Sequence, residues 1–190
     1  MKNRFATAML AATLSLPAAA ALPAGAAAPT IELQAALAGK EFTYRLQDAL
    51  KKGPAVVYFY PSAYTGGCNV QAHTFAENSE KFAAAGASII GVSLDSIARL
   101  SEFSADPKYC AGKIPVASDP DGKTAQAYDL TVKNVPGIKD SRGADIDHGF
   151  AERTTFIVAP DGKIAATIGG MKPEENVEAA LAAVQKLKKN

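Results

Sequence analysis

The sequence contains few of the residues that build metal centres, disulfide frameworks or nucleic-acid surfaces. It has no tryptophan, two cysteines and two histidines among 190 residues. Two cysteines cannot form a disulfide-rich framework or a four-thiolate zinc site, and the spacings C-x2-C and H-x3-H are absent. The formal net charge of +1 gives no electrostatic reason to expect nucleic acid or an anionic membrane as a partner.

The remaining composition is that of an ordinary folded chain. Hydrophobic residues make up 48% and charged residues 21% of the sequence, which excludes a largely disordered protein. The length suits one domain with a substantial core. The sequence therefore predicts a compact domain whose few reactive side chains carry the chemistry.

Residues 1–28 have the pattern of a secretory signal peptide. Lys2 and Arg4 precede an apolar run from Phe5 to Leu16, and several A-x-A sites follow between Ala18 and Ala28. The alternative is an uncleaved membrane anchor, but the prolines and weakly apolar alanines are unfavourable for a spanning helix.

Cleavage near residue 28 leaves a single domain over residues 29–190. Loss of Lys2 and Arg4 leaves 18 basic and 19 acidic residues, a net charge of −1. We expect this domain to be periplasmic, or secreted if the cell has no outer membrane, without stable membrane association. Disulfides persist in such compartments.

The hydrophobic pattern predicts an α/β fold with a mixed central sheet flanked by helices. Predicted strands cover residues 55–60, 88–94 and 114–117, and a hairpin at Asp161-Gly162 joins 154–159 to 163–168. Predicted helices cover 67–85, 96–105, the short segment 124–128, and a last helix from Pro173. In the helix 67–85, Val70, Phe75 and Phe82 are expected to face the core. Residues 133–150 read as a surface loop.

Cys68 lies where a buried strand is expected to pass into a helix. The unpaired N–H groups at a helix start favour an anion, and the thiolate is the nucleophilic form of cysteine. Thr65, three residues earlier, has a hydroxyl within reach of the sulfur. Ligand and catalytic sites of α/β proteins are usually found at such strand ends. A buried structural cysteine is the alternative.

The segment Tyr58–Cys68, which reads YFYPSAYTGGC, resembles the peroxiredoxin signature. In that signature a proline is followed after three residues by threonine and after two more by cysteine. The surroundings are similar to the Q-type subfamily, also called bacterioferritin comigratory proteins, from about residue 41 to residue 185. Further matching segments are Gly91–Ser93 with Asp95, Ser118–Lys123, Arg153–Phe156 and Asp161–Lys163.

The resemblance implies a thioredoxin-like fold and reduction of hydrogen peroxide and organic hydroperoxides, without metal or organic cofactor, in antioxidant defence. Cys68 would be the peroxidatic cysteine, which becomes a sulfenic acid. Thr65 would hydrogen-bond the peroxide oxygens and Pro61 would shield the thiolate. Arg153 would stabilise both the thiolate and the polarised O–O bond. A solvent-facing strand residue is the alternative for Arg153.

The sequence departs from the Q-type pattern at the resolving cysteine. Many relatives place that cysteine five residues after the peroxidatic one, where this chain has His73. Some resolve from a later region, so Cys110 is expected to resolve after local unwinding of the helix that carries Cys68. An inert buried thiol and a permanent Cys68–Cys110 disulfide are the alternatives.

Neither histidine has an assigned role. His73 is expected to face solvent, and His148 is expected in the loop near the site. Cys68, His73 and His148 contain metal-ligand atoms, but no short spacing supports a metal site.

Two other functions compete with a thioredoxin-dependent peroxiredoxin. A thioredoxin-like thiol-disulfide oxidoreductase normally needs Cys-x-x-Cys, whereas Gln71 stands three residues after Cys68. A non-enzymatic copper-binding redox protein on the same fold needs Cys-x-x-x-Cys, whereas Ala72 stands at that position. The expected partners are a hydroperoxide and a thioredoxin-like or small-thiol reductant, and we expect a monomer or a weak homodimer.

Overall fold

The structure is a computed structural model and describes residues 21–188. Residues 1–20, which contain most of the predicted signal peptide, lie outside the described residues. Within residues 21–188, no helix is long and apolar enough to span a membrane.

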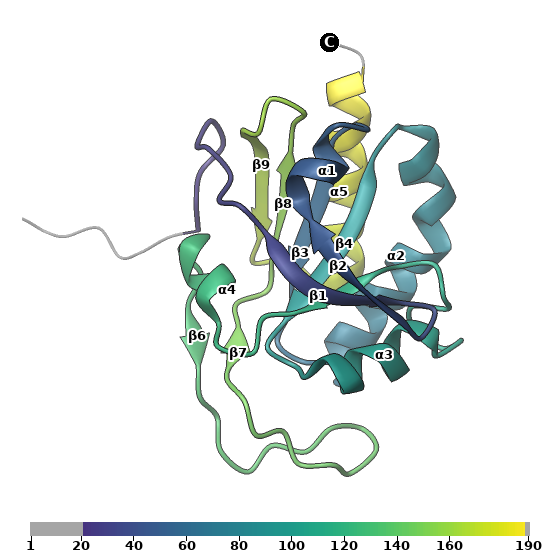
Figure 1. The fold of residues 1–190 in the computed structure, drawn as a ribbon, viewed down its shortest axis with the longest axis vertical. Helices are drawn as coiled ribbons and strands as arrows, with labels where there is room; N and C mark the ends of the chain where they lie inside the picture. The colour runs from purple at the N-terminus through teal and green to yellow at the C-terminus, as the bar shows by residue number, and fades with distance from the viewer. Residues whose placement is uncertain (1–20, 189–190) are drawn as a thin grey trace, which may run out of the picture.

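Seven strands of the described chain form one mixed sheet in the order β2-β1-β5-β4-β3-β8-β9 (Figure 1). The strands are β1 (Glu32–Leu37), β2 (Lys40–Arg45), β3 (Ala55–Phe59), β4 (Ser88–Ser93), β5 (Val116–Ser118), β8 (Thr154–Val158) and β9 (Ile164–Gly169). β3, β4 and β5 are parallel, and the other neighbours pair antiparallel. Because parallel strands end at the same edge of a sheet, the segments that follow these three strands lie near one another.

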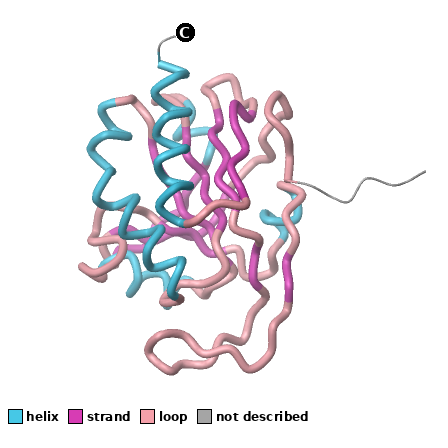
Figure 2. Tube along the Cα trace, turned by 180° about the vertical axis from the view of Figure 1, so that it is seen from behind, coloured by secondary structure: helices cyan, strands magenta, loops and turns pink. Residues whose placement is uncertain are grey.

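Helices cover both faces of the sheet and enclose two hydrophobic cores. The helices are α1 (Leu46–Leu50), α2 (Gly66–Ala84), α3 (Ile97–Ala105), α4 (Lys123–Ala127) and α5 (Pro173–Lys188). Along β3, Val56 and Tyr58 face the core beneath α2, α3 and α5, whereas Val57 and Phe59 face the core beneath α1 and α4. Figure 2 shows α2 and α5 side by side on their face. This alternation buries β3 completely, as its apolar sequence predicts.

A short separate ribbon lies outside the main sheet. β6 (Val132–Lys133) pairs with β7 (Phe150–Ala151) and joins the ends of the loop 134–149, which extends at the bottom of Figure 1. The predicted surface loop over residues 133–150 is thereby confirmed in its main part.

The predicted strands, the hairpin at Asp161-Gly162 and the helices are confirmed to within a few residues. The predicted orientation of Val70 is wrong, since this side chain is 37% exposed. Val70 lies five positions before the buried Phe75, which is about 140° around the helix. Phe75 and Phe82 are fully buried, as predicted.

The β1–β2 hairpin has no clear signal in the sequence. Its turn places Ala38 at φ 51° and Gly39 at φ 77°. Two left-handed residues make a tight hairpin turn, for which Asn-Gly is the usual sequence. Alanine is uncommon in that conformation because its Cβ clashes with the backbone, so Ala-Gly does not predict the turn.

Residues 21–28 are hydrogen-bonded to the folded domain. The Gly25 N–H donates to the Ile164 carbonyl at 2.8 Å, and the Ala28 N–H donates to the Gly162 carbonyl at 2.9 Å. The Thr167 hydroxyl donates to the Leu22 carbonyl at 2.6 Å. This segment therefore forms part of the folded unit, although it lies within the predicted signal region.

Candidate active site

The buried carboxylate of Asp95 fixes the turn between β3 and α2 by hydrogen bonds. Asp95, just after β4, accepts hydrogen bonds from the Ser62 hydroxyl and the Ala63 N–H, each at 2.8 Å. It also accepts from the Ser93 hydroxyl at 2.7 Å, and His148 Nε2 lies 2.9 Å from it. Burial would raise the pKa of Asp95, but the hydrogen bonds from His148 and Ala63 outweigh burial and lower it. Asp95 is therefore an ionised anchor for this turn.

His148 lies close to the turn, as expected for a residue of this loop. Burial would lower the pKa of His148, but its hydrogen bonds with Asp95 and with the Gly149 carbonyl raise the pKa above its usual value. The imidazole thus connects the loop 134–149 to the carboxylate beneath the turn.

Tyr64, in the same turn, is fixed by a second set of contacts. Its φ is 60°, an uncommon conformation for a tyrosine. The Arg142 guanidinium lies 3.4 Å from its ring centroid, and the Ser141 N–H donates to its carbonyl at 2.8 Å. Cation–π and backbone contacts from the loop therefore hold the turn in this strained conformation.

Helix α2 begins directly after this turn, with Thr65 as its N-terminal cap and Cys68 in its first turn. The Thr65 hydroxyl donates to the Ser62 carbonyl at 2.8 Å rather than to the sulfur. The first N–H groups of a helix have no intrahelical acceptor, and the first turn of α2 contains no acidic residue. Both features favour negative charge at Cys68, which is 2% exposed.

Arg153 reaches the sulfur because of the strand register. β8 runs antiparallel to β3 and pairs Thr154 with Phe59, so the residue before β8 lies at the end of β3. Arg153 Nη2 lies 3.2 Å from Cys68 Sγ, and Nη1 donates to Gln71 Oε1. The structure thus joins the two predicted site residues across 85 positions of sequence.

Pro61 contributes to the wall of a cavity of about 490 Å³. The cavity is lined by Pro61, Thr131, Lys133, Val135, Phe150, Ala151 and Glu152. Of the predicted site residues, Pro61 alone lines this cavity, and Glu152 directly precedes Arg153 in the chain.

The second thiol lies deeper. Cys110 is fully buried in the same hydrophobic core as Cys68, and burial raises its thiol pKa. Cys68 and Cys110 are both free thiols in the structure, which contains no disulfide between them. No hydrogen bond within residues 21–188 joins Cys110 to Arg153 or Thr65.

The remaining candidates are separate from this site. His73 is exposed, as predicted, and its Nε2 lies 3.3 Å from Glu77. Within residues 21–188, no group of three or more histidine, cysteine, aspartate or glutamate side chains is arranged to hold a metal.

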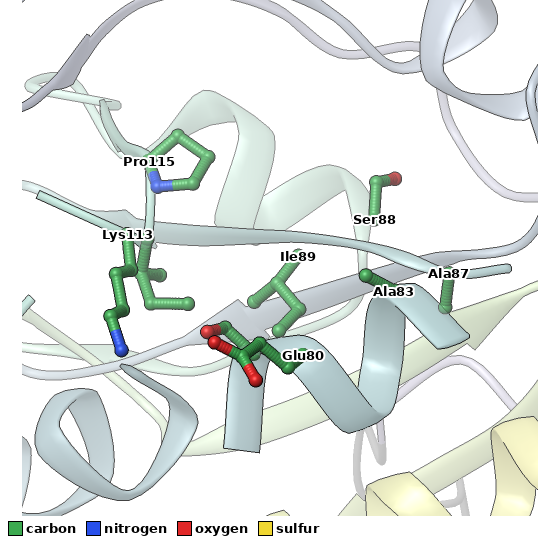
Figure 3. A pocket seen from close by; sticks show the side chains of 9 residues that line it. Glu80, Ala83, Ala87, Ser88, Ile89, Lys113 and Pro115 are labelled. Carbon is green, nitrogen blue, oxygen red and sulfur yellow. The ribbon is translucent and has the colours of Figure 1, made fainter. Parts of the chain in front are cut away.

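A second cavity, of about 470 Å³, lies between α2, the start of β4 and the segment before β5 (Figure 3). Glu80 enters it from α2, and Lys113 enters it from the segment before β5. Neither cysteine is among the residues that line it, and Cys68 lies at the opposite end of α2.

Comparison with known proteins gives the same result as the site geometry. The AhpC/TSA family profile matches residues 24–167. The chain belongs to the AhpC/TSA family. It is 33% identical to peroxiredoxin Bcp of Xanthomonas campestris pv. campestris over 131 residues, which is 68% of this chain and 75% of the relative. It is 32% identical to chloroplastic peroxiredoxin Q of Oryza sativa subsp. japonica over 160 residues, 79% of this chain and 66% of the relative.

Solved structures confirm the predicted thioredoxin-like fold of this peroxiredoxin. BcpB from Mycobacterium tuberculosis has a TM-score of 0.73 at 25% identity, with 87% of this chain and 98% of that chain covered. Peroxiredoxin Q from Xanthomonas campestris has a TM-score of 0.65 at 29% identity, with 82% and 91% covered. The protein is a thiol-dependent peroxidase of the Bcp/peroxiredoxin Q type, in preference to the oxidoreductase and copper-protein alternatives.

Sequence reasoning missed two residues of the peroxiredoxin site. Gln71 stands one helical turn after Cys68, so the three-residue spacing already placed it beside the sulfur. Gly67 leaves room for the guanidinium, since a Cβ there would lie 3.2 Å from Arg153 Nη2 and 3.4 Å from Pro173 Cγ. No spacing rule indicates this role for Gly67, because it depends on a residue from a distant strand.

Gly67→Ala is expected to displace the Arg153 guanidinium and lower the rate of reaction with hydrogen peroxide by about tenfold. Gly66→Ala is the matched control, because a Cβ at Gly66 meets no atom within 4 Å. Alanine stabilises a helix relative to glycine by up to about 1 kcal/mol, so neither variant should unfold more easily. Stopped-flow peroxide kinetics and urea unfolding check this, and equal rates for the two variants would contradict it.

Proposed function

We propose that Cys68 is the peroxidatic cysteine of this peroxiredoxin and that Arg153, Thr65 and Pro61 complete its active site. The observation that carries the proposal is the 3.2 Å contact between Arg153 Nη2 and Cys68 Sγ at the start of α2. A guanidinium and the N–H groups of a helix start both stabilise a thiolate, which is the reacting form. Pro61, beside the cavity, limits access of water to the sulfur.

In the proposed reaction the Cys68 thiolate attacks the terminal oxygen of the hydroperoxide. The S–O bond forms as the O–O bond breaks, and the hydroxyl remains on sulfur as a sulfenic acid. The alkoxide, or hydroxide from hydrogen peroxide, leaves and takes up a proton. Negative charge moves from sulfur to the leaving oxygen, so a fixed cation beside both atoms lowers the barrier. The Thr65 hydroxyl, which donates its own hydrogen to the Ser62 carbonyl, would accept a hydrogen bond from the O–H of the hydroperoxide, and this proton stays on the oxygen that is transferred to sulfur.

We propose that organic hydroperoxides are substrates as well as hydrogen peroxide. A solved structure of the bacterioferritin comigratory protein of Xanthomonas campestris, 29% identical to this chain, is described in terms of alkyl peroxide reduction. The cavity beside Pro61 includes Val135 and Phe150, which can contact an alkyl group.

Cys68→Ser is expected to abolish consumption of hydrogen peroxide by the reduced protein, a loss of at least about a thousandfold, because serine is not ionised at neutral pH. The wild type should consume one equivalent in the first turnover. Cys110→Ser is the matched control and should retain that turnover. Loss of the first turnover in Cys110→Ser alone would show that the wrong cysteine has been assigned.

We propose that Cys110 then resolves the sulfenic acid. Its thiolate would attack the Cys68 sulfur, the S–O bond would break, and hydroxide would leave and take up a proton to become water as the Cys68–Cys110 disulfide forms. Both sulfurs belong to one core beside Tyr58, whose hydroxyl is buried without a hydrogen-bond partner among residues 21–188. Burial raises the pKa of Tyr58, and Cys110 and Cys68 raise it further. Because burial keeps Cys110 protonated, the start of α2 and the segment around Cys110 must open before the disulfide forms. A thioredoxin-like or small-thiol reductant would then restore both thiols, in a protein that acts as a monomer or weak homodimer.

Peptide mass spectrometry after peroxide treatment is expected to find Cys68 joined to Cys110 in the wild type. In Cys110→Ser the Cys68 sulfenic acid should persist until an external thiol is added. Trapping with a dimedone-type reagent, which reacts with sulfenic acids, measures the Cys68 sulfenic acid in both proteins. A stable sulfenic acid in the wild type with Cys110 still free would refute resolution by Cys110 and indicate a one-cysteine cycle.

We propose that the protein is exported and that the signal peptide is cleaved before Ala21. The basic start and apolar run support export. The hydrogen bonds of residues 21–28 to the β8–β9 hairpin support the Ala18–Ala20 site over a cut near residue 28, since the later cut would remove these bonds. The expected location is the periplasm, or outside the cell where there is no outer membrane.

The intact mass of the protein recovered from the periplasm is expected to correspond to residues 21–190. A chain that starts at Pro29 should be less stable to urea than one that starts at Ala21, by up to about 5 kcal/mol, because five hydrogen bonds between residues 21–28 and the rest of the domain are lost and each contributes about 1 kcal/mol. A mature protein that starts at Pro29 and is equally stable would refute the earlier cut.

A further inference from the structure

A chain of buried side chains continues behind Arg153. Gln71 accepts from Arg153 with Oε1, and its Nε2 donates to Asn176 Oδ1 at 3.0 Å. The Thr155 hydroxyl donates to the same Asn176 oxygen at 2.6 Å. Asn176 Nδ2 donates to the Ile168 carbonyl at 3.1 Å. Gln71, Asn176 and Thr155 are each at most 1% exposed, so water does not replace these bonds.

The two ends of this chain determine the orientation of both amides. A backbone carbonyl can only accept, so Asn176 must turn its NH2 group toward Ile168. The Asn176 oxygen then faces Gln71, which must present its own NH2 group there. Gln71 Oε1 is left facing Arg153, whose guanidinium can only donate. A reversed Gln71 would place two sets of donors against each other.

Asn176 is an unusual side chain for its place. The other buried residues of α5 are Val177, Ala180 and Val184, which are apolar. A buried amide is unfavourable unless its hydrogen bonds are satisfied, and here the oxygen accepts two bonds and the nitrogen donates one. These bonds join α5 to α2 one turn beyond Cys68.

Arginine has a long, flexible side chain, and one contact does not define the direction of its guanidinium. Two contacts, one through each terminal nitrogen, place it against both Gln71 and the sulfur. A side chain that fixes the orientation of Gln71 therefore fixes the direction of Arg153.

We propose that Asn176 is a positioning residue, which holds Gln71 in the orientation that directs Arg153 at Cys68. This inference rests on the proposed roles of Cys68 and Arg153. Asn176 does not touch the sulfur, and it acts on the reaction through Gln71 alone.

Asn176→Leu, which has a similar volume but no amide, is expected to slow the reaction of the reduced protein with hydrogen peroxide by about tenfold. The rate at which iodoacetamide alkylates Cys68 increases with pH as the thiolate forms. In Asn176→Leu this increase should occur at a higher pH than in the wild type, because the thiolate loses a fixed cation. Cys110→Ala in every variant leaves Cys68 as the single thiol.

Val177→Ala is the matched control, since it removes buried apolar volume from the next position of α5. It should lower stability to urea yet keep the wild-type peroxide rate and alkylation profile. The same rate loss in Val177→Ala as in Asn176→Leu would overturn the proposal, because the effect would then come from helix packing. If Asn176→Leu does not fold, Asn176→Ala replaces it in the same comparison.

A double-mutant cycle with Gln71→Met tests whether the effect passes through Gln71. The double variant should react at the rate of Gln71→Met alone. Losses that multiply would overturn the proposal, since Asn176 would then act independently of Gln71. The alkylation profile reports on Cys68 even in the absence of peroxidase activity, so failure of the proposed function and failure of this inference can be distinguished.

Discussion

The antiparallel pairing of β8 with β3 is the constraint on which the active site depends. It places the residue before β8 at the end of β3, where α2 begins, so Arg153 lies beside Cys68. A shift of one residue would turn Arg153 to the other face of the sheet, because side chains alternate along a strand. The register is in turn secured by burial of β3 and β8 on both faces.

Two buried polar networks meet around the sulfur. In front of it, Asp95 holds the turn that ends in Thr65, with His148 and the loop 134–149 against it. Behind it, Asn176 and Gln71 extend from α5 to Arg153. Asp95, Gln71 and Asn176 are at most 1% exposed, so the hydrogen bonds of these side chains are stronger than at the surface and define one arrangement.

The same burial is unfavourable for the proposed second step, in which Cys110 resolves the Cys68 sulfenic acid. The reduced enzyme keeps Cys68 in an ordered helix and Cys110 protonated inside the core. That arrangement suits attack on a small peroxide, which needs an oriented thiolate. It opposes formation of a disulfide, which needs the helix start and the second thiol to move. In the proposed cycle, oxidation of Cys68 to a sulfenic acid would remove the charge that Arg153 is proposed to stabilise, so the helix start would be held less firmly at the stage when it must open.

Much of this protein could be predicted from the sequence because the determining signals are local. Buried strands and the Asp161-Gly162 turn follow from short patterns, and Pro61, Thr65 and Cys68 lie within eight residues of one another. Only the tertiary structure determined three features: the hydrogen-bond partners of Gln71, the space that Gly67 leaves for the Arg153 guanidinium, and the complete burial of Cys110. Those features depend on how α2, α5 and β8 pack, and contacts between residues about a hundred positions apart leave no periodic or local pattern in a single sequence.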